Sequence, residues 1–408
     1  MAGFFFWGHR TAMAKIDFVW ELGAGTGHVT TLHPIALAMK ARGHAVRFLL
    51  RDLSAGADLE GAAEIAREGA PVWSGPALHA NPLNFSEILL NFGYHDPAAV
   101  TALIGAWRER LRASHAVVAN VAPAAHLAAR TLGIPSFEIS QGFHVPPPEM
   151  PAPPLRDWAP APRAQLEAAD RRVLEAINRA LQSFGAQPIA TVGEMFTGRS
   201  MLLTYPELDI YPQRGPAEYF GIPDGGEGRA VPAWPAGTRA RVFAYLYSYY
   251  AGLDLLLGTL ARLGIRTLAF CRNIDPKLKE KHGGGCVHLA DEPMAVTPLL
   301  PEADIVICHA SHQMTAQALL AGKPLLMLPT QLEQFLITRR VVRNGAGLGI
   351  APDVPNPDYA RALDDLEGNA KYAARAREFS ARYAGHDRDT ALRTIIARVE
   401  AAVARPAV

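Results

Sequence analysis

The strongest constraint on the fold is a pattern of short apolar runs that alternate with helix-like segments, and it occurs twice along the chain. In the first half, strands are predicted at 16–20, 45–50, 116–119 and 135–139, and helices up to residue 42, at 58–67 and at 122–132. In the second half, strands are predicted at 242–246, 267–270, 304–307 and 324–328, and helices at 253–263 and 311–320. Strand–helix–strand units at this spacing favour parallel pairing with right-handed crossovers. We therefore expect an α/β protein with two parallel-sheet halves, although sequence similarity between the halves is too weak to indicate a repeat.

Shifts in composition mark the expected domain limits. The 408 residues fit two domains of about 150 residues or more each. A proline-dense stretch follows residue 145, a long helix is predicted at 164–184, and a second stretch rich in glycine and proline begins at residue 221. We expect a tail or start-site extension over 1–12, a first domain over 13–220, a linker over 221–240, a second domain over 241–385 and a mostly solvated C-terminal helix over 386–408.

Charge and cysteine content exclude several classes of protein. Forty Lys and Arg residues against 39 Asp and Glu leave a net charge of +1, which argues against a nucleic-acid partner because such proteins carry a basic surface. Three cysteines without a CxxC pair indicate neither a disulfide framework nor a structural zinc site, so a cytoplasmic location is the default. No run of about eighteen apolar residues predicts a transmembrane segment.

A glycine-rich loop, GAGTGH over 23–28, lies between the first predicted strand and helix. A dinucleotide fingerprint needs a third glycine at the position where this chain has His28, so the loop argues against an NAD site. Gly25 and Gly27 are candidates for a phosphate or backbone-approach loop. His28 would lie at the carboxyl edge of a parallel sheet, where a neutral imidazole can act as a general base. The alternative for His28 is a loop histidine that caps the helix.

The segment 308–334 is the densest cluster of candidate binding residues. A predicted strand ends before His309, and a helix N-terminus with free backbone N–H groups follows, which suits a diphosphate. Glu333 and Gln334 follow the next predicted strand and suit the recognition of hydroxyl groups. The alternative is a capped helix with an ordinary strand-to-helix loop.

Together these motifs resemble those of nucleotide-sugar-dependent glycosyltransferases with the GT-B fold, in particular the UDP-glycosyltransferase and bacterial macrolide-type family. The family's donor motif runs His-Gly-Gly-x-Gly-Thr-x-x-Glu, then Ala-Gly-x-Pro, a strand ending in proline, and Asp-Gln. This chain has, in register, His309, Ala321-Gly322-Lys323-Pro324, Pro329 and Glu333-Gln334. The opening GTGHVTTLHPIALAMKARGH over 25–44 is similar to the family's first loop and helix. The resemblance covers most of 15–350.

The resemblance implies two Rossmann-like parallel-sheet domains facing across a cleft, with C-terminal helices crossing back. It implies an inverting, metal-independent transfer of a sugar to a hydroxyl of a small-molecule or lipid-linked acceptor. His28 would be the general base and Asn120 its partner. The donor, a UDP- or dTDP-linked sugar, would be held by Ser248, Met294, His309, Ser311, Thr315, Gln317, Glu333 and Gln334. No further cofactor is implied, and acceptor, sugar and nucleotide base stay open.

Several positions depart from the family pattern. Asn120 stands where many relatives have an aspartate that orients the histidine, and an amide can orient a ring but cannot neutralise its charge. Ala310 and Ser311 replace glycines, and Gln317 replaces a glutamate that binds ribose hydroxyls. These changes keep open a non-catalytic nucleotide-sugar-binding or partner protein as an alternative. A nucleotide-sugar epimerase or a phosphorylase stays open as well, because the fold alone does not separate these enzymes from a glycosyltransferase.

The acceptor side has weaker signals. A helix-like segment over 81–96 and the loop 141–151 are both candidates for lining an acceptor pocket, although aromatic residues at helical spacing are more often core. Glu207 and Asp209 form a carboxylate pair just before the predicted linker, and we interpret the pair as structural.

Overall fold

The computed structural model describes residues 13–196, 199–222, 231–386 and 388–404, and these divide into two compact units. The first unit contains 13–203, 213–220 and 389–404, and the second contains 204–212 and 221–388. The predicted tail over 1–12 and the middle of the predicted linker, 223–230, lie outside the described residues.

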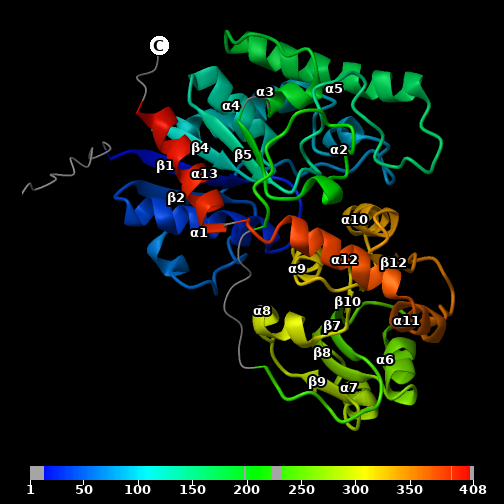
Figure 1. Cartoon of the computed structure of the whole chain (residues 1–408). Coiled ribbons are helices and arrows are strands. Elements are labelled where there is room, and N and C mark those ends of the chain that lie inside the picture. Colours follow the sequence, from blue (N-terminus) through cyan, green and yellow to red (C-terminus); the bar gives the residue numbers. More distant parts are fainter. Residues whose placement is uncertain (1–12, 197–198, 223–230, 387, 405–408) are drawn as a thin grey trace, which may run out of the picture. The chain divides into compact units, whose positions relative to one another are not determined.

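The first unit is built on a parallel sheet whose strands follow the order β3-β2-β1-β4-β5-β6 (Figure 1). These strands are β1 (Lys15–Trp20), β2 (Ala45–Leu50), β3 (Ala66–Gly69), β4 (Ala116–Ala119), β5 (Ser136–Ser140) and β6 (Ser200–Leu202). The helices of this unit are α1 (Gly27–Ala41), α2 (Phe85–Leu90), α3 (Pro97–Leu111), α4 (Pro123–Leu132), α5 (Arg163–Ser183) and α13 (Arg388–Val403). Two apolar cores cover the two faces, one under α1 and α13 and the other under α3, α4 and α5.

The second unit repeats this plan with the strand order β12-β11-β10-β7-β8-β9. Its strands are β7 (Arg241–Tyr247), β8 (Arg266–Arg272), β9 (Val287–Ala290), β10 (Ile305–Cys308), β11 (Leu325–Met327) and β12 (Gly347–Gly349). Its helices are α6 (Leu253–Arg262), α7 (Pro276–His282), α8 (Val296–Leu299), α9 (His312–Leu320), α10 (Leu332–Arg343), α11 (Tyr359–Gly368) and α12 (Ala370–Arg382). Read from its own first strand, each sheet therefore has the Rossmann order 3-2-1-4-5-6.

This order creates a switch point in each sheet. The chain leaves the first strand of the unit towards one side and the fourth strand towards the other, so a crevice opens where those two strands end. In the first unit these strands are β1 and β4, paired in register from Ile16–Ala116 to Val19–Ala119. In the second unit they are β7 and β10. Loops that follow these four strands are therefore the expected positions for ligand-binding residues.

The helix predicted at 58–67 is wrong. This segment holds a single 3₁₀ turn, Ala62–Glu64, and then edge strand β3, which pairs in parallel with β2 from Arg47–Ala66 to Leu50–Gly69. Within this segment, Gly61 adopts a positive φ angle of 72°, which interrupts a helix. The helix-like segment 81–96 shortens to α2, which begins after Asn84 because the Asn84 side chain accepts a bond from the Glu87 N–H.

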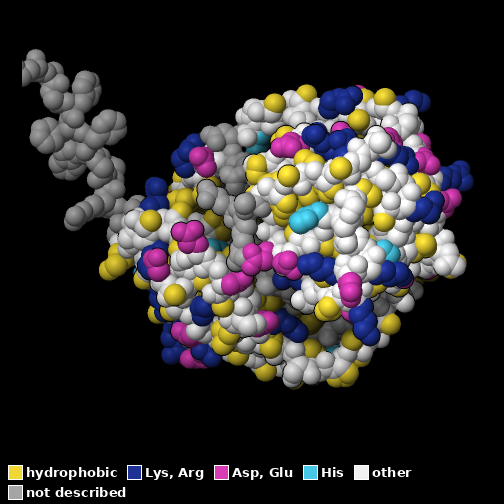
Figure 2. Space-filling view, turned by 90° about the horizontal axis from the view of Figure 1, so that it is seen from below, with side chains coloured by type: hydrophobic (Ala, Val, Ile, Leu, Met, Phe, Trp, Pro, Cys, Tyr) yellow, Lys and Arg dark blue, Asp and Glu magenta, His cyan; other side chains and the backbone are white. Residues whose placement is uncertain are grey.

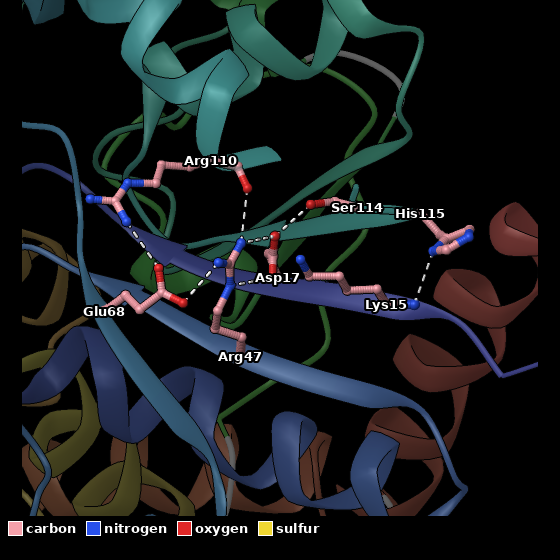
Figure 3. Close-up of polar contacts among 7 residues, drawn as sticks. All are labelled: Lys15, Asp17, Arg47, Glu68, Arg110, Ser114 and His115. Atoms are coloured by element: carbon pink, nitrogen blue, oxygen red, sulfur yellow. Dashed lines mark hydrogen bonds and ion pairs between the residues drawn. The ribbon is translucent and has the colours of Figure 1, made fainter. Parts of the chain in front are cut away.

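A charged network crosses the sheet of the first unit near the amino ends of its strands (Figure 3). Arg47 donates to both carboxylate oxygens of Asp17, at 3.0 and 2.8 Å, and to Glu68 at 2.9 Å. Asp17 is fully buried and also accepts from the Ser114 hydroxyl. Arg110 donates to Glu68 at 2.9 Å. The network connects β1, β2 and β3 with the end of α3. The two parallel hydrogen bonds from Arg47 offset the cost of removing the Asp17 carboxylate from water.

The last helix belongs to the first unit, in accord with the predicted return of the C-terminal helices. Ile395, Ile396 and Val399 of α13 pack in the same core as Ile16 and Phe18 of β1. Glu400 on this helix accepts from Arg42 at 2.8 Å and contacts His44 at 3.2 Å. The two preceding helices, α11 and α12, stay in the second unit, where α12 packs against α9.

The surface carries both charge signs, intermingled. On the face in Figure 2, Lys and Arg side chains alternate with Asp and Glu. None of the helices in the described part of the chain combines the length and the apolar character needed to cross a membrane.

Candidate active site

The first candidate site is the loop between β1 and α1. Gly23 and Gly25 adopt φ angles of 91° and 89°, which glycine reaches without strain. A Cβ atom on Gly23 would lie 2.6 Å from Nε2 of His28, so the imidazole occupies the space that a side chain would need. No atom lies within 4 Å of a Cβ built on Gly25 or Gly27. Gly23 was not among the predicted site residues, although it stands in the same motif.

The structure brings His28 and Asn120 together. Nδ1 of His28 lies 2.6 Å from Oδ1 of Asn120, which follows β4 at the switch point of the sheet. The Asn120 side-chain NH₂ donates to the Ile139 carbonyl of β5 at 2.5 Å, so its oxygen must be the atom that faces the ring. An amide oxygen only accepts hydrogen bonds, and Nδ1 therefore carries the proton. Nε2 is then the unprotonated nitrogen, and it faces the glycine loop, whose Ala24 backbone also interacts with the His28 ring.

A stacking contact holds the His28 ring, and burial lowers its pKa. The Trp20 ring stacks on the His28 ring with centroids 4.8 Å apart and planes 17° from parallel. Burial lowers the pKa of His28 from its ordinary value, while the Asn120 bond and the charge of Glu138 oppose that effect. His28 is therefore a neutral imidazole at neutral pH.

A second histidine, His144, lies beside His28, and sequence reasoning missed it. The two ring centroids are 6.5 Å apart. Phe143 and Phe85 hold the His144 ring by edge contacts at 4.6 and 6.2 Å. Burial lowers the pKa of His144 to about 3, so its ring is also neutral. The nearest signal in the sequence was the loop 141–151, which was a candidate for lining the acceptor pocket.

The second candidate site lies at the switch point of the second unit, around His309. Its Nδ1–H donates to the Leu328 carbonyl at 2.7 Å, and its Nε2 accepts from the Tyr247 backbone N–H at 3.0 Å. The ring is buried and stacks on the Tyr247 ring at 5.1 Å. Burial lowers the pKa of His309. Both nitrogens therefore bind backbone, and the ring joins the ends of β7, β10 and β11.

The residues after His309 form the N-terminus of α9. Ala310 has a φ angle of 53°, a left-handed conformation that glycine adopts more readily than alanine. Ser311 is the N-cap residue, and its side chain makes no capping bond. The first backbone N–H groups of a helix have no partner within the helix, so this end offers donors to an anion. Ser248, exposed in the loop after β7, follows the Tyr247 N–H that binds His309.

The remaining predicted donor residues differ in exposure. Thr315 is fully buried near the Cys308 thiol, Met294 lies in the apolar core, and only 7% of Gln317 is exposed. Glu333 is partly buried in the first turn of α10, and desolvation raises its pKa to about 7. The Gln334 side-chain oxygen accepts from the Thr330 N–H at 2.7 Å, which orders the loop after β11. The side chains of Ser248, Ser311 and Glu333 are therefore at least partly exposed, whereas those of Met294, Thr315 and Gln317 are buried.

The carboxylates at 207 and 209 have structural partners, as the sequence analysis proposed. Glu207 accepts from the Tyr383 hydroxyl at 2.6 Å and pairs with Arg382, and Asp209 accepts from the Tyr211 N–H at 2.9 Å. Within the described residues, no group of three or more His, Cys, Asp or Glu side chains is arranged to hold a metal ion.

The two Rossmann-type sheets, each with candidate ligand residues at its switch point, define the GT-B fold. No protein-family model matches the sequence. The chain is 26% identical over 379 residues to a zeaxanthin glucosyltransferase from Pseudescherichia vulneris, which covers 84% of this chain and 88% of that protein. It superposes on the calicheamicin glycosyltransferase CalG4 with a TM-score of 0.69, at 16% identity over 96% of this chain and 99% of the other.

The spinosyn rhamnosyltransferase SpnG has also been solved with a comparable fold. Its complex with thymidine diphosphate gives a TM-score of 0.65 at 19% identity, covering 93% of this chain and 99% of that one. The same enzyme has been solved with spinosyn aglycone. These comparisons confirm the predicted fold and the predicted resemblance to bacterial macrolide-type glycosyltransferases.

Proposed function

We propose that the protein is an inverting glycosyltransferase that moves a sugar from a nucleoside-diphosphate donor to a hydroxyl group of a small-molecule or lipid-like acceptor. The observation that carries this proposal is the fixed tautomer of His28, whose Nδ1–H is held by Asn120 and whose Nε2 is left as a base. A neutral imidazole within reach of a hydroxyl group is suited to take its proton.

The reaction is a direct displacement at the anomeric carbon. The acceptor O–H bond breaks as Nε2 of His28 takes the proton, and the acceptor oxygen forms a bond to the anomeric carbon. The bond from that carbon to the phosphate oxygen breaks, and its electron pair leaves with the diphosphate. One displacement inverts the anomeric configuration. Holding both substrates in line supplies much of the rate in such reactions.

The second unit would hold the donor. The α9 N-terminus supplies backbone N–H groups for the diphosphate, and donors aimed at a leaving group stabilise its developing charge. Ser248 and Ser311 add hydroxyl groups at the same end of the sheet. His309 would act by fixing the loop, because both of its ring nitrogens bind backbone. Glu333 and Gln334 would bind sugar hydroxyls.

The related proteins support this donor and acceptor class. SpnG was solved with thymidine diphosphate and with an aglycone, and the relative from Pseudescherichia vulneris is named for glucosyl transfer to zeaxanthin. A dTDP- or UDP-linked sugar is therefore the proposed donor, and a hydroxylated apolar small molecule is the proposed acceptor.

A second candidate function is nucleotide-sugar binding without catalysis. It is favoured by the Asn120 amide, which cannot neutralise an imidazolium, and by the strained Ala310 in the loop that would approach the phosphates. The unprotonated Nε2 of His28 favours catalysis over this alternative.

A thermal-shift panel of UDP, dTDP, GDP, ADP and their common sugar conjugates tests the donor proposal. A ligand at a hundred times its Kd stabilises the folded state by about 2.7 kcal/mol, which raises Tm measurably. We expect one nucleotide and its sugar conjugates to shift Tm. The shift should persist in His28→Ala, because His28 lies in the first unit, and fall in Ser311→Pro. A flat panel would reject nucleotide-sugar binding altogether.

A further inference from the structure

Glu138 of β5 is a buried carboxylate immediately beside the His28–Asn120 pair. It is 1% exposed, and it pairs in register with Ala119, the last residue of β4 before Asn120. Its neighbour Ile139 supplies the carbonyl that fixes the Asn120 amide. Glu138 itself accepts a hydrogen bond from the Val121 backbone N–H at 2.9 Å. Two consecutive residues of β5, Glu138 and Ile139, thus hold the two residues that follow β4: Glu138 binds Val121 and Ile139 binds Asn120.

Val121 is the strained element of this arrangement. Its φ angle is 56°, which is a conformational outlier for a β-branched residue. The Val121 carbonyl accepts from the Glu21 and Leu22 N–H groups at 3.3 and 2.9 Å, so the turn is held from both sides. Left-handed backbone in a β-branched residue costs about 1–3 kcal/mol and persists where the surroundings enforce it. This turn directs Asn120 towards Nδ1 of His28.

Glu138 has a further partner, the buried ring of His126. Its second oxygen contacts Nε2 of His126 at 2.9 Å, and Nδ1 of His126 lies 3.0 Å from the Ser136 hydroxyl. The other buried carboxyl in the neighbourhood is Glu21 after β1, and burial raises its pKa to about 8. His144 next to His28 is neutral at ordinary pH.

We propose that Glu138 is a positioning residue for His28: it holds the strained Val121 turn through which Asn120 orients the imidazole, and it supplies the negative charge that the Asn120 amide lacks. This inference rests on the proposed function. The charge of Glu138 raises the pKa of His28 against the effect of burial. In the transfer step the same charge would stabilise the imidazolium that forms when His28 takes the acceptor proton.

The test is the titration of His28 in the full-length protein with labelled histidine, followed by NMR without donor or acceptor. The His28 resonance is the one missing in His28→Ala. We expect Glu138→Gln to lower the His28 pKa below that of the wild type. The double variant Asn120→Asp/Glu138→Gln, which moves the carboxylate to the end of β4, should raise it again. Glu400→Gln is the matched control, because Glu400 is another largely buried glutamate paired with a histidine, His44.

Transfer kinetics add a second readout. Glu138→Gln should lower kcat with little change in donor KM, because it removes the charge that would stabilise the imidazolium in the transfer step. A His28 pKa in Glu138→Gln equal to that of the wild type and of Glu400→Gln would overturn the proposal. If Glu138→Gln does not fold, Glu138→Asp replaces it, since it keeps the charge and retracts it from the Val121 N–H. Wild-type pKa and rate in Glu138→Asp would then overturn the proposal.

The two measurements separate this inference from the proposed function. The titration needs no substrate, so it reports on Glu138 whether or not the protein transfers sugar. Wild-type transfer by His28→Ala would reject the base assignment even if Glu138→Gln shifts the His28 titration.

Discussion

Nδ1 of His28 lies 2.6 Å from Oδ1 of Asn120; His28 is in the first turn of α1, the helix that follows β1, and Asn120 directly follows β4. The sheet order makes this pairing possible, because these strands are neighbours and their following loops leave in opposite directions. The second unit repeats the relationship, since His309 after β10 accepts from the Tyr247 N–H at the end of β7. The switch point therefore holds the proposed base in the first unit and the proposed diphosphate-binding loop in the second.

Asn120→Asp should raise the pKa of His28, because a carboxylate beside Nδ1–H favours the protonated ring. The base is active when unprotonated, so the acid limb of the kcat/KM profile should move to higher pH. Asn178→Asp, at an amide that bonds Ile189 elsewhere in the first unit, is the control and should leave the limb in place. An acid limb that stays fixed or moves to lower pH in Asn120→Asp would contradict the assigned tautomer.

The wild-type pH profile should reflect the lowered pKa of His28. Burial disfavours the imidazolium, so protonation that removes the base should occur only below the ordinary histidine value of about 6.5. We expect kcat/KM to be level at neutral and mildly alkaline pH and to fall on the acid side of that value. A half-maximal rate at a pH above 6.5 would mean that the base is another group or that His28 is not desolvated.

Ala310→Gly should stabilise the protein by about 0.5–1 kcal/mol. Its φ angle of 53° costs alanine about 1–2 kcal/mol, whereas glycine loses part of that gain through greater freedom of the unfolded chain. Urea unfolding measures the difference. Ala316→Gly, in the interior of α9, is the control and should destabilise by at least about 1 kcal/mol. Equal destabilisation by both changes would show that Ala310 is not strained.

Arg47→Met should destabilise the first unit by about 3–5 kcal/mol, because it leaves the fully buried Asp17 carboxylate without its cation. Arg112→Met is the matched control. Arg112 pairs with Glu109 on the surface, where such pairs contribute less than about 1 kcal/mol. Chemical denaturation of both variants tests the contrast, and a loss of under 1 kcal/mol in Arg47→Met would contradict the role of the network.

The sequence was sufficient to predict the parts of the fold that have strong local patterns. The first strand, the glycine loop and α1 were predicted, and so were β7, α6 and α9. The short edge strands β3, β6, β9 and β12 were not, because three or four residues carry no periodic signal and pairing with a neighbour stabilises them. The common strand order of the two units is a property of the backbone and left no recognisable repeat in the side chains.

The site was predictable where a residue stands in a motif. The resemblance to glycosyltransferases paired His28 with Asn120, and the structure brings them together. His144 and Glu138 lie in no motif, since they reach the site through the loop after β5 and the register of β5 with β4. The fit of Gly23 against His28 depends on a three-dimensional contact that spacing does not encode. His309 was predicted as a diphosphate ligand, but its two backbone bonds could be found only in the structure.

The most direct test of the account is glycosyl transfer by His28→Ala. The donor is the nucleotide sugar that shifts Tm, and zeaxanthin is the first acceptor tested, with other hydroxylated apolar molecules after it. His115→Ala is the matched control, since His115 is an exposed histidine that bonds the Lys15 N–H at the opposite end of the same sheet. The account predicts that His28→Ala loses transfer by about a hundredfold or more while donor binding is kept, and that His115→Ala keeps both. Transfer by His28→Ala at the wild-type rate would contradict the central claim.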